Sequence, residues 1–175
     1  MTRVWTLGVI LAVALSAAAC DDDDNGTSPT PTPTGTRFTA QLRPANENPP
    51  VTNADATATG TMTLTLNVVR DSSQQITSAT GDFSVNMTGF PANTTLTGAH
   101  IHNGRPGVNA PVVVNLAIAG AETTLATGAS TITKTAITVD PVHAQNMIND
   151  PDGYYFNVHT TINTGGAIRG QLVKQ

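Results

Sequence analysis

Hydrophobic and polar residues alternate strictly along two neighbouring segments of the chain, 61–69 and 81–90. The stretch TMTLTLNVV places Met62, Leu64, Leu66 and Val68 between polar residues, and GDFSVNMTGF does the same for Phe83, Val85 and Met87. Successive side chains of a β-strand point to opposite faces, so this pattern predicts two half-buried strands. The polar RDSSQQ between them predicts a hairpin loop.

Further segments are rich in β-branched residues and are bounded by glycine, proline and asparagine. They are TRFTAQL, TLTGAHIH, APVVVNLA, STITKTAITV, YYFNVHTT and GGAIRGQLVK. One short helix is expected in DPVHAQNMIND, where Asp140 is suited to the N-cap and Pro141 to the first helical position. Many short strands without a βαβ rhythm predict an all-β protein, either an antiparallel sandwich or a Greek-key barrel.

The first twenty residues have the features of an export signal. Arg3 precedes a long apolar run that ends in SAAAC, which contains the only cysteine, Cys20. This ending resembles a bacterial lipoprotein signal, although Ala17 stands where that family usually has leucine. The resemblance implies that residues 1–19 are removed and that Cys20 is lipidated, which would anchor the chain to a membrane. Ordinary secretion with an incidental cysteine is the alternative.

Residues 20–35 are expected to form a disordered tether. They contain DDDD followed by a Thr-Pro repeat, which repels itself, disfavours helix and has no apolar side chains to bury. Four of the twelve acids lie in this tether and one of the eight bases, Arg3, lies in the signal, so the 36–175 domain carries eight acids and seven bases. A domain with net charge −1 and no basic cluster is not expected to bind nucleic acid.

Three longer motifs carry a resemblance to a known family. They are FTAQLRPANENPPV, GAHIHNGRPGVNAPVVVNL and DGYYFNVHTTINTGGAIRGQL. In this order they resemble the CHRD domain, named after the developmental protein chordin and also found in many bacterial exported proteins. The resemblance covers residues 37–173 and implies an immunoglobulin-like β-sandwich or barrel. It implies no particular activity, because the molecular function of the family is poorly defined.

Strand parity places several polar side chains on one face. His100 and His102 flank the apolar Ile101, so both imidazoles point away from the core. If the strands are neighbours, the same face holds further side chains from the two later motifs, namely Asn157, His159, Arg169 and Gln171. A His-X-His pair on a strand can give two imidazoles to one metal ion. The candidate ligands are therefore His100, His102 and His159, with Asn157 and Arg169 as supporting residues and copper or zinc as the metal.

A second resemblance points to the same residues. HIH, NVH and AIR follow one another as the corresponding motifs do in copper/zinc superoxide dismutase, another Greek-key barrel. The chain has no bridging histidine, no His/His/Asp zinc group between residues 103 and 120, and no second cysteine for the internal disulfide. An intact dismutase is therefore not expected, and a simpler copper or zinc site without these features is one interpretation of the histidines.

A structural role for the same residues is the alternative. Imidazoles, Asn157 and Arg169 would then hold the segment rich in glycine, asparagine and proline that follows HIHNG, by pairing its buried backbone groups. His143, in the expected helix, is interpreted as solvated. NENPPV and GGAIRG are interpreted as strand-edge and turn elements.

Two functional classes remain open. The sequence has no phosphate-binding loop, no G-x-S-x-G motif, no cysteine nucleophile in the domain and no acid close to the histidines in sequence, so an enzyme is not favoured. The first class is a membrane-tethered binding module in the cell envelope, outside the cytoplasm, with a protein or glycan partner. The second is a copper- or zinc-binding protein on the same scaffold.

Overall fold

The computed structural model describes residues 34–175. The expected signal 1–19, Cys20 and the tether up to residue 33 lie outside the described residues. Within the described part, no helix is both long enough and apolar enough to cross a bilayer.

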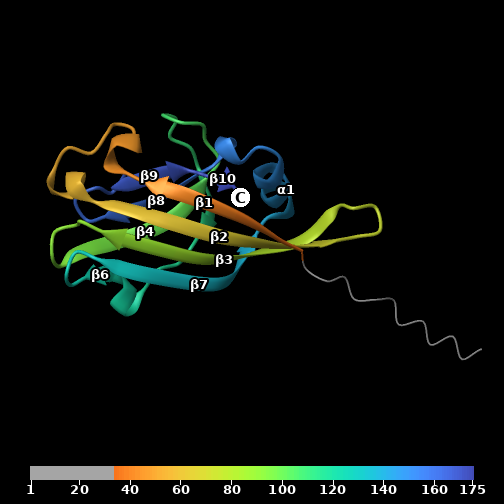
Figure 1. Ribbon diagram of the computed structural model, residues 1–175, viewed down its shortest axis with the longest axis horizontal. Coiled ribbons are helices and arrows are strands. Elements are labelled where there is room, and N and C mark those ends of the chain that lie inside the picture. Colours follow the sequence, from red (N-terminus) through yellow and green to blue (C-terminus); the bar gives the residue numbers. More distant parts are fainter. Residues whose placement is uncertain (1–33) are drawn as a thin grey trace, which may run out of the picture. The chain divides into compact units, whose positions relative to one another are not determined.

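The domain is a sandwich of two antiparallel sheets, which Figure 1 shows as two layers. The first sheet has the order β10-β1-β2-β3-β7, with β1 at Thr34–Leu42, β2 at Thr59–Arg70, β3 at Ile76–Thr88, β7 at Ser130–Val139 and β10 at Val173–Lys174. The second has the order β5-β4-β8-β9, with β4 at Thr94–His102, β5 at Val112–Asn115, β8 at Tyr155–Thr160, β9 at Ile168–Gln171, and β6 (Thr124–Leu125) paired to the start of β4. The predicted all-β sandwich is confirmed.

The hairpin between β2 and β3 forms where the polar RDSSQQ segment predicts it. The Asp71 carboxylate accepts the backbone N–H groups of Ser73 at 2.8 Å and Gln75 at 3.0 Å, and it thereby closes the turn. This is a local side-chain-to-backbone turn, the structure that aspartate favours over regular elements.

The hydrophobic core lies between the two sheets. The alternating residues of β2 and β3 face it. The second sheet contributes the apolar residues next to the histidines, Asn157 and Arg169, namely Ala99, Ile101, Phe156, Val158 and Ile168. All of these are 4% exposed or less. Burial of each large apolar side chain contributes about 1.5–3 kcal/mol, so the core determines which face of β4 and β8 the polar residues occupy.

The one α-helix, α1 (Pro141–Asn149), begins as expected. The Asp140 carboxylate accepts the N–H groups of Val142 at 2.8 Å and His143 at 3.3 Å, and Pro141 occupies the first turn. The helix packs on β3. The interpretation of His143 as a solvated residue is wrong, because its ring is half-buried and Nδ1 lies 3.2 Å from the Tyr154 hydroxyl.

Four short 3-10 helices complete the fold. They are η1 (Pro44–Asn46), η2 (Ala54–Thr57), η3 (Gly120–Thr123) and η4 (Pro151–Gly153). The NENPPV motif begins at the end of η1 and turns the chain toward η2, in agreement with its interpretation as a turn element.

The face of the second sheet opposite the core is also covered. The segment 103–111, between β4 and β5, is hydrogen-bonded across this face to β8 and β9. As a result Asn157 and Arg169 are each only 1% exposed. Parity places these residues on the face opposite the core, as predicted, and the 103–111 segment buries them there.

Candidate metal centre

The pairing of β4 with β8 brings three histidines together. Gly98 pairs with His159, His100 with Asn157 and His102 with Tyr155, so all six positions share one face of the sheet. The ring centroid of His100 lies 4.9 Å from that of His159 and 5.7 Å from that of His102. One ring nitrogen from each histidine lies within 4.8 Å of the other two.

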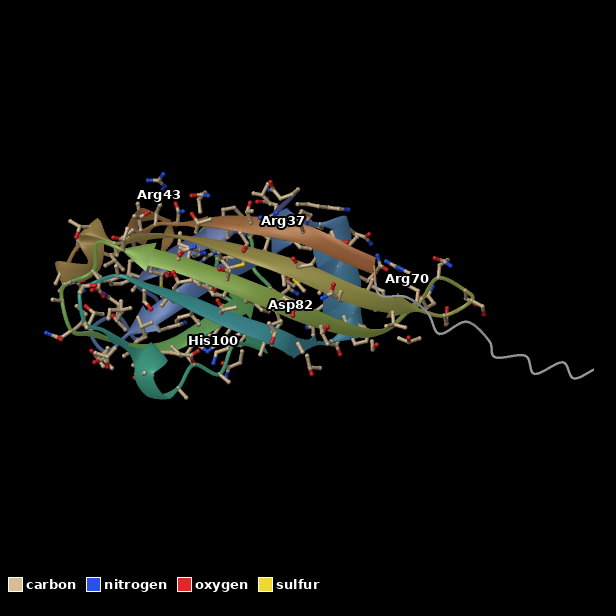
Figure 2. All side chains as sticks on the ribbon, turned by 60° about the horizontal axis from the view of Figure 1, so that its bottom comes forward. Arg37, Arg43, Arg70, Asp82 and His100 are labelled. Carbon is tan, nitrogen blue, oxygen red and sulfur yellow. The ribbon has the colours of Figure 1, made fainter. Side chains whose placement is uncertain are left out.

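In Figure 2, Arg37 and Asp82 lie on the first sheet, and His100 lies away from them, beyond the edge of that sheet. Its ring rests on Gly98: a Cβ built at Gly98 would lie 2.5 Å from His100 Cε1. Real Cβ contacts are not this short, so any larger residue at position 98 would displace the imidazole. The glycine in GAHIH is therefore a sequence signal for the ring position that sequence reasoning missed.

Two of the histidines have defined tautomers. His102 Nδ1–H donates to the Ala110 carbonyl at 2.7 Å, and His159 Nδ1–H donates to the Thr164 carbonyl at 2.9 Å. A carbonyl oxygen only accepts, so the hydrogen must be on Nδ1 in both rings. In the neutral ring Nε2 then carries a lone pair. Metal-binding histidines typically donate their other ring N–H in this way.

The amide oxygen of Asn157 lies between these two rings. Oδ1 is 3.0 Å from Nε2 of His102 and 3.0 Å from Nε2 of His159. Three atoms with lone pairs thus converge at the same point on the face of the sheet.

The environment favours the neutral form of His100 and His102. Burial, with smaller contributions from the nearby His159 and His102, lowers the pKa of His100 from 6.5 to about 4. Burial also lowers the pKa of His102 and outweighs the hydrogen bonds to Ala110 and Asn157 that raise it. Among the described residues, the buried Nδ1 of His100 has no hydrogen-bond partner. Neutral imidazoles are the form that binds metal.

A buried carboxyl group, Glu47, lies behind Asn157. Burial raises the pKa of Glu47 to about 7, although the positive charge of Arg169 and a hydrogen bond with Asn157 lower it in part. A Cβ at Gly166, where φ is +135°, would overlap the Glu47 carboxyl. Sequence reasoning found no acid near the histidines because Glu47 precedes them by some fifty residues.

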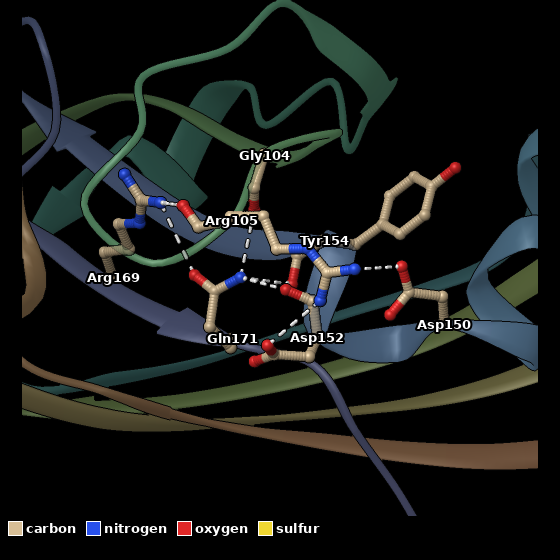
Figure 3. Close-up of polar contacts among 7 residues, drawn as sticks. All are labelled: Gly104, Arg105, Asp150, Asp152, Tyr154, Arg169 and Gln171. Carbon is tan, nitrogen blue, oxygen red and sulfur yellow. Dashed lines mark hydrogen bonds and ion pairs between the residues drawn. The ribbon is translucent and has the colours of Figure 1, made fainter.

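Arg169 and Gln171 hold the 103–111 segment rather than the cluster (Figure 3). Arg169 Nη2 donates to the carbonyls of Arg105 at 2.9 Å and Val108 at 3.0 Å. Gln171 Nε2 donates to the Gly104 carbonyl at 3.0 Å. Arg169 therefore satisfies backbone groups that the fold buries, which is the structural role considered for it above.

Tyr155 connects Arg169 to the cluster. Its ring stacks on His102 with centroids 4.6 Å apart and planes 2° apart, and the Arg169 guanidinium carbon lies 3.4 Å from its centroid. This packing and the Ala110 carbonyl together fix the orientation of His102.

The arrangement can hold a transition metal. Ligand atoms about 2.0–2.1 Å from a tetrahedral ion lie about 3.4 Å apart. The three ring nitrogens lie within 4.8 Å of one another, so side-chain rotations that move each nitrogen by about 1 Å would bring them to bonding positions. Imidazole suits zinc and copper. Because His100 and His159 are only half-buried, an ion has a path to the site.

These observations define an all-β sandwich with a three-histidine cluster on its second sheet. The family model of the CHRD domain matches residues 38–172. The chain therefore belongs to the CHRD domain family, as its motifs predict. No curated protein and no solved structure matches the chain.

Proposed function

We propose that this CHRD domain binds one Zn²⁺ or Cu²⁺ ion through Nε2 of His102, Nε2 of His159 and a ring nitrogen of His100. One observation carries the proposal. Both Nδ1–H groups are used by backbone carbonyls, so the two Nε2 atoms keep their lone pairs, and one ring nitrogen of each of the three histidines lies within 4.8 Å of the other two.

A purely structural role accounts for only half of this geometry. Holding the backbone requires the Nδ1–H groups of His102 and His159, which donate to Ala110 and Thr164. It gives no reason for the convergence of the Nε2 atoms. It also leaves His100 unexplained, because within residues 34–175 its buried Nδ1 makes no hydrogen bond. A bound cation accounts for all three rings.

Binding, not turnover, is the proposed role. Among the described residues, the group able to hold a metal consists of the three imidazoles and includes no carboxylate ligand. The domain is then a non-enzymatic binding module whose ligand is the ion. A protein or glycan partner fits this role as well.

The proposed location is the cell envelope, outside the cytoplasm. The support is the sequence: an export signal over 1–19, one cysteine at its end, and the acidic Thr-Pro tether over 20–35. Lipidated Cys20 would hold the domain at the membrane by its acyl chains.

Titration of the chain lacking residues 1–20 with Zn²⁺ and with Cu²⁺ tests the proposal, with isothermal calorimetry and elemental analysis after dialysis. One ion per chain is expected, with binding abolished in His102→Ala and in His159→Ala. His143→Ala is the matched control, because this histidine lies on α1 outside the cluster, and it should bind as the unchanged protein does. Absence of stoichiometric binding by the unchanged protein, or equal binding by all four proteins, would contradict the proposal.

A further inference from the structure

We infer that Asn157 is the fourth ligand of this centre through its amide oxygen, and that the resulting N₃O site selects a divalent ion over Cu⁺. The inference rests on the proposed function and specifies the ligand set and the class of ion. It assigns Asn157 a direct bond to the metal instead of the supporting role that the sequence suggested.

The four residues form a regular arrangement on two adjacent strands. β4 carries His100-X-His102, and β8 carries Asn157-X-His159 at positions that share the same face. His100 lies directly across from Asn157 in the register. Two pairs of ligands, each with a spacing of two residues, thus supply four donor atoms, the number that tetrahedral zinc sites use.

The positions of the ring hydrogens, rather than the distances, favour a shared cation beside the amide oxygen. Oδ1 lies 3.0 Å from Nε2 of both His102 and His159. A hydrogen bond would need a hydrogen on Nε2, but the carbonyls of Ala110 and Thr164 already require the single hydrogen of each neutral ring on Nδ1. Three lone pairs at this separation repel one another unless a positive charge lies among them.

Glu47 fixes the orientation of the amide. Asn157 Oδ1 lies 3.0 Å from both histidine nitrogens, so the NH₂ group is on the other side of the amide, where Glu47 lies. Turning the amide over would direct Oδ1 at the carboxylate oxygens. The 6% exposed Glu47 is itself confined beneath Gly166. The amide oxygen is therefore held in the direction of the centre from behind.

The donor set determines the class of ion. An amide oxygen is a hard ligand that suits divalent ions, whereas Cu⁺ prefers soft thiolate or thioether ligands and gains little from it. Loss of Oδ1 should therefore weaken the binding of Zn²⁺ and Cu²⁺ and leave Cu⁺ nearly unaffected. A residue that merely positioned the imidazoles would affect all three ions alike.

The first test compares Asn157→Leu, which has a similar volume and no ligand atom, with the unchanged protein and with His159→Ala. Competition with a chelator should show that Asn157→Leu raises the Kd for Zn²⁺ by at least about tenfold and changes that for Cu⁺ by less than about threefold. Equal weakening for both ions, or an unchanged Kd for Zn²⁺, overturns the inference. If His159→Ala abolishes binding and Asn157→Leu does not weaken it, the proposed function stands and the inference about Asn157 fails. If the unchanged protein binds no ion, the proposed function itself fails.

The second test uses the unchanged protein, so it does not depend on whether Asn157→Leu folds. In a crystal structure of the unchanged protein with Zn²⁺, the expected distance from Asn157 Oδ1 to the ion is about 2.0–2.2 Å. An ion bound by the three imidazoles with Oδ1 more than about 3 Å away, or with a water in its place, overturns the inference.

Discussion

The ring of His100 lies against the backbone of Gly98, two residues earlier on the same strand, with no room for a Cβ between them. The same glycine pairs with His159 on β8, so its missing side chain is what allows the two imidazoles to approach to 4.9 Å. The absence of a side chain at Gly98 thus determines the position of the His100 ring.

Gly98→Ala should therefore disrupt the centre. The added methyl group displaces His100, and we expect the Kd for Zn²⁺ to rise by about 10–100-fold with a stability loss of about 1–3 kcal/mol from overpacking. Calorimetric titration and thermal unfolding measure the two effects. Gly165→Ala is the matched control, because a Cβ there meets nothing within 4 Å. Equal Zn²⁺ affinity in the two variants would contradict the role of Gly98.

Replacement of the buried Arg169 by methionine should release the 103–111 segment. The carbonyls of Arg105 and Val108 lose their donors, and we expect a loss of about 2–4 kcal/mol in the free energy of unfolding. Amide hydrogen exchange should show the lost protection within this segment. Arg105→Met is the control, because its ion pairs with Asp150 and Asp152 are exposed and such pairs contribute at most about 1 kcal/mol. Similar losses in both variants would show that Arg169 has no special role.

The buried Glu47 should make stability depend on pH. Its pKa is raised from 4.5 to about 7, so between these values the folded chain keeps a proton that the unfolded chain releases. The free energy of unfolding contributed by this group therefore falls as pH rises from about 4.5 to about 7, by up to about 3 kcal/mol. Glu47→Gln cannot titrate and should not show this decline.

The measurement is the difference in the free energy of unfolding between Glu47→Gln and the unchanged protein, by urea titration at several pH values. The lowered pKa values of His100 and His102 are present in both proteins, so their opposite contribution to the pH dependence largely cancels in the difference. The advantage of the variant should increase across the interval. A difference that does not change with pH would show that folding does not raise the pKa of Glu47.

Cys20→Ser should release the protein from the membrane fraction, because the acyl chains on Cys20 are the proposed anchor. Fractionation of cells that express each form, followed by immunoblotting, measures the distribution. If the variant still sediments with membranes, another part of the chain holds it there and the lipid-anchor proposal is wrong.

Sequence patterns predicted the local features and the contacts between paired strands. Alternation identified the buried faces of β2 and β3, and the Asp-Pro pair identified the start of α1. Parity placed His100, His102 and His159 on one face because the strands that carry them are neighbours. These properties depend on the hydrophobic periodicity and on helix-capping residues, both of which are determined by residues close together in the sequence.

The remainder of the centre depends on contacts between segments far apart in the sequence. The Ala110 and Thr164 carbonyls that set the tautomers belong to connecting segments, whose path over the sheet no periodicity defines. For the same reason, the sequence indicated that Arg169 holds the segment after HIHNG as one alternative, but not which carbonyls it contacts. Glu47 reaches Asn157 from the connection after β1, and no spacing rule relates those two residues.

Thermal and chemical unfolding of the unchanged protein and of His159→Ala, each with and without Zn²⁺, tests the central claim most directly. Binding to the folded state alone adds RT ln(1 + [Zn²⁺]/Kd), which is about 2.7 kcal/mol at 100 times Kd and rises with free Zn²⁺. We predict this concentration-dependent gain in the unchanged protein and its loss in His159→Ala. Without metal, His159→Ala should also be less stable by about 1–3 kcal/mol, because the Thr164 carbonyl loses its donor. The same stability with and without Zn²⁺ in the unchanged protein would contradict the metal centre and leave the histidines a purely structural role.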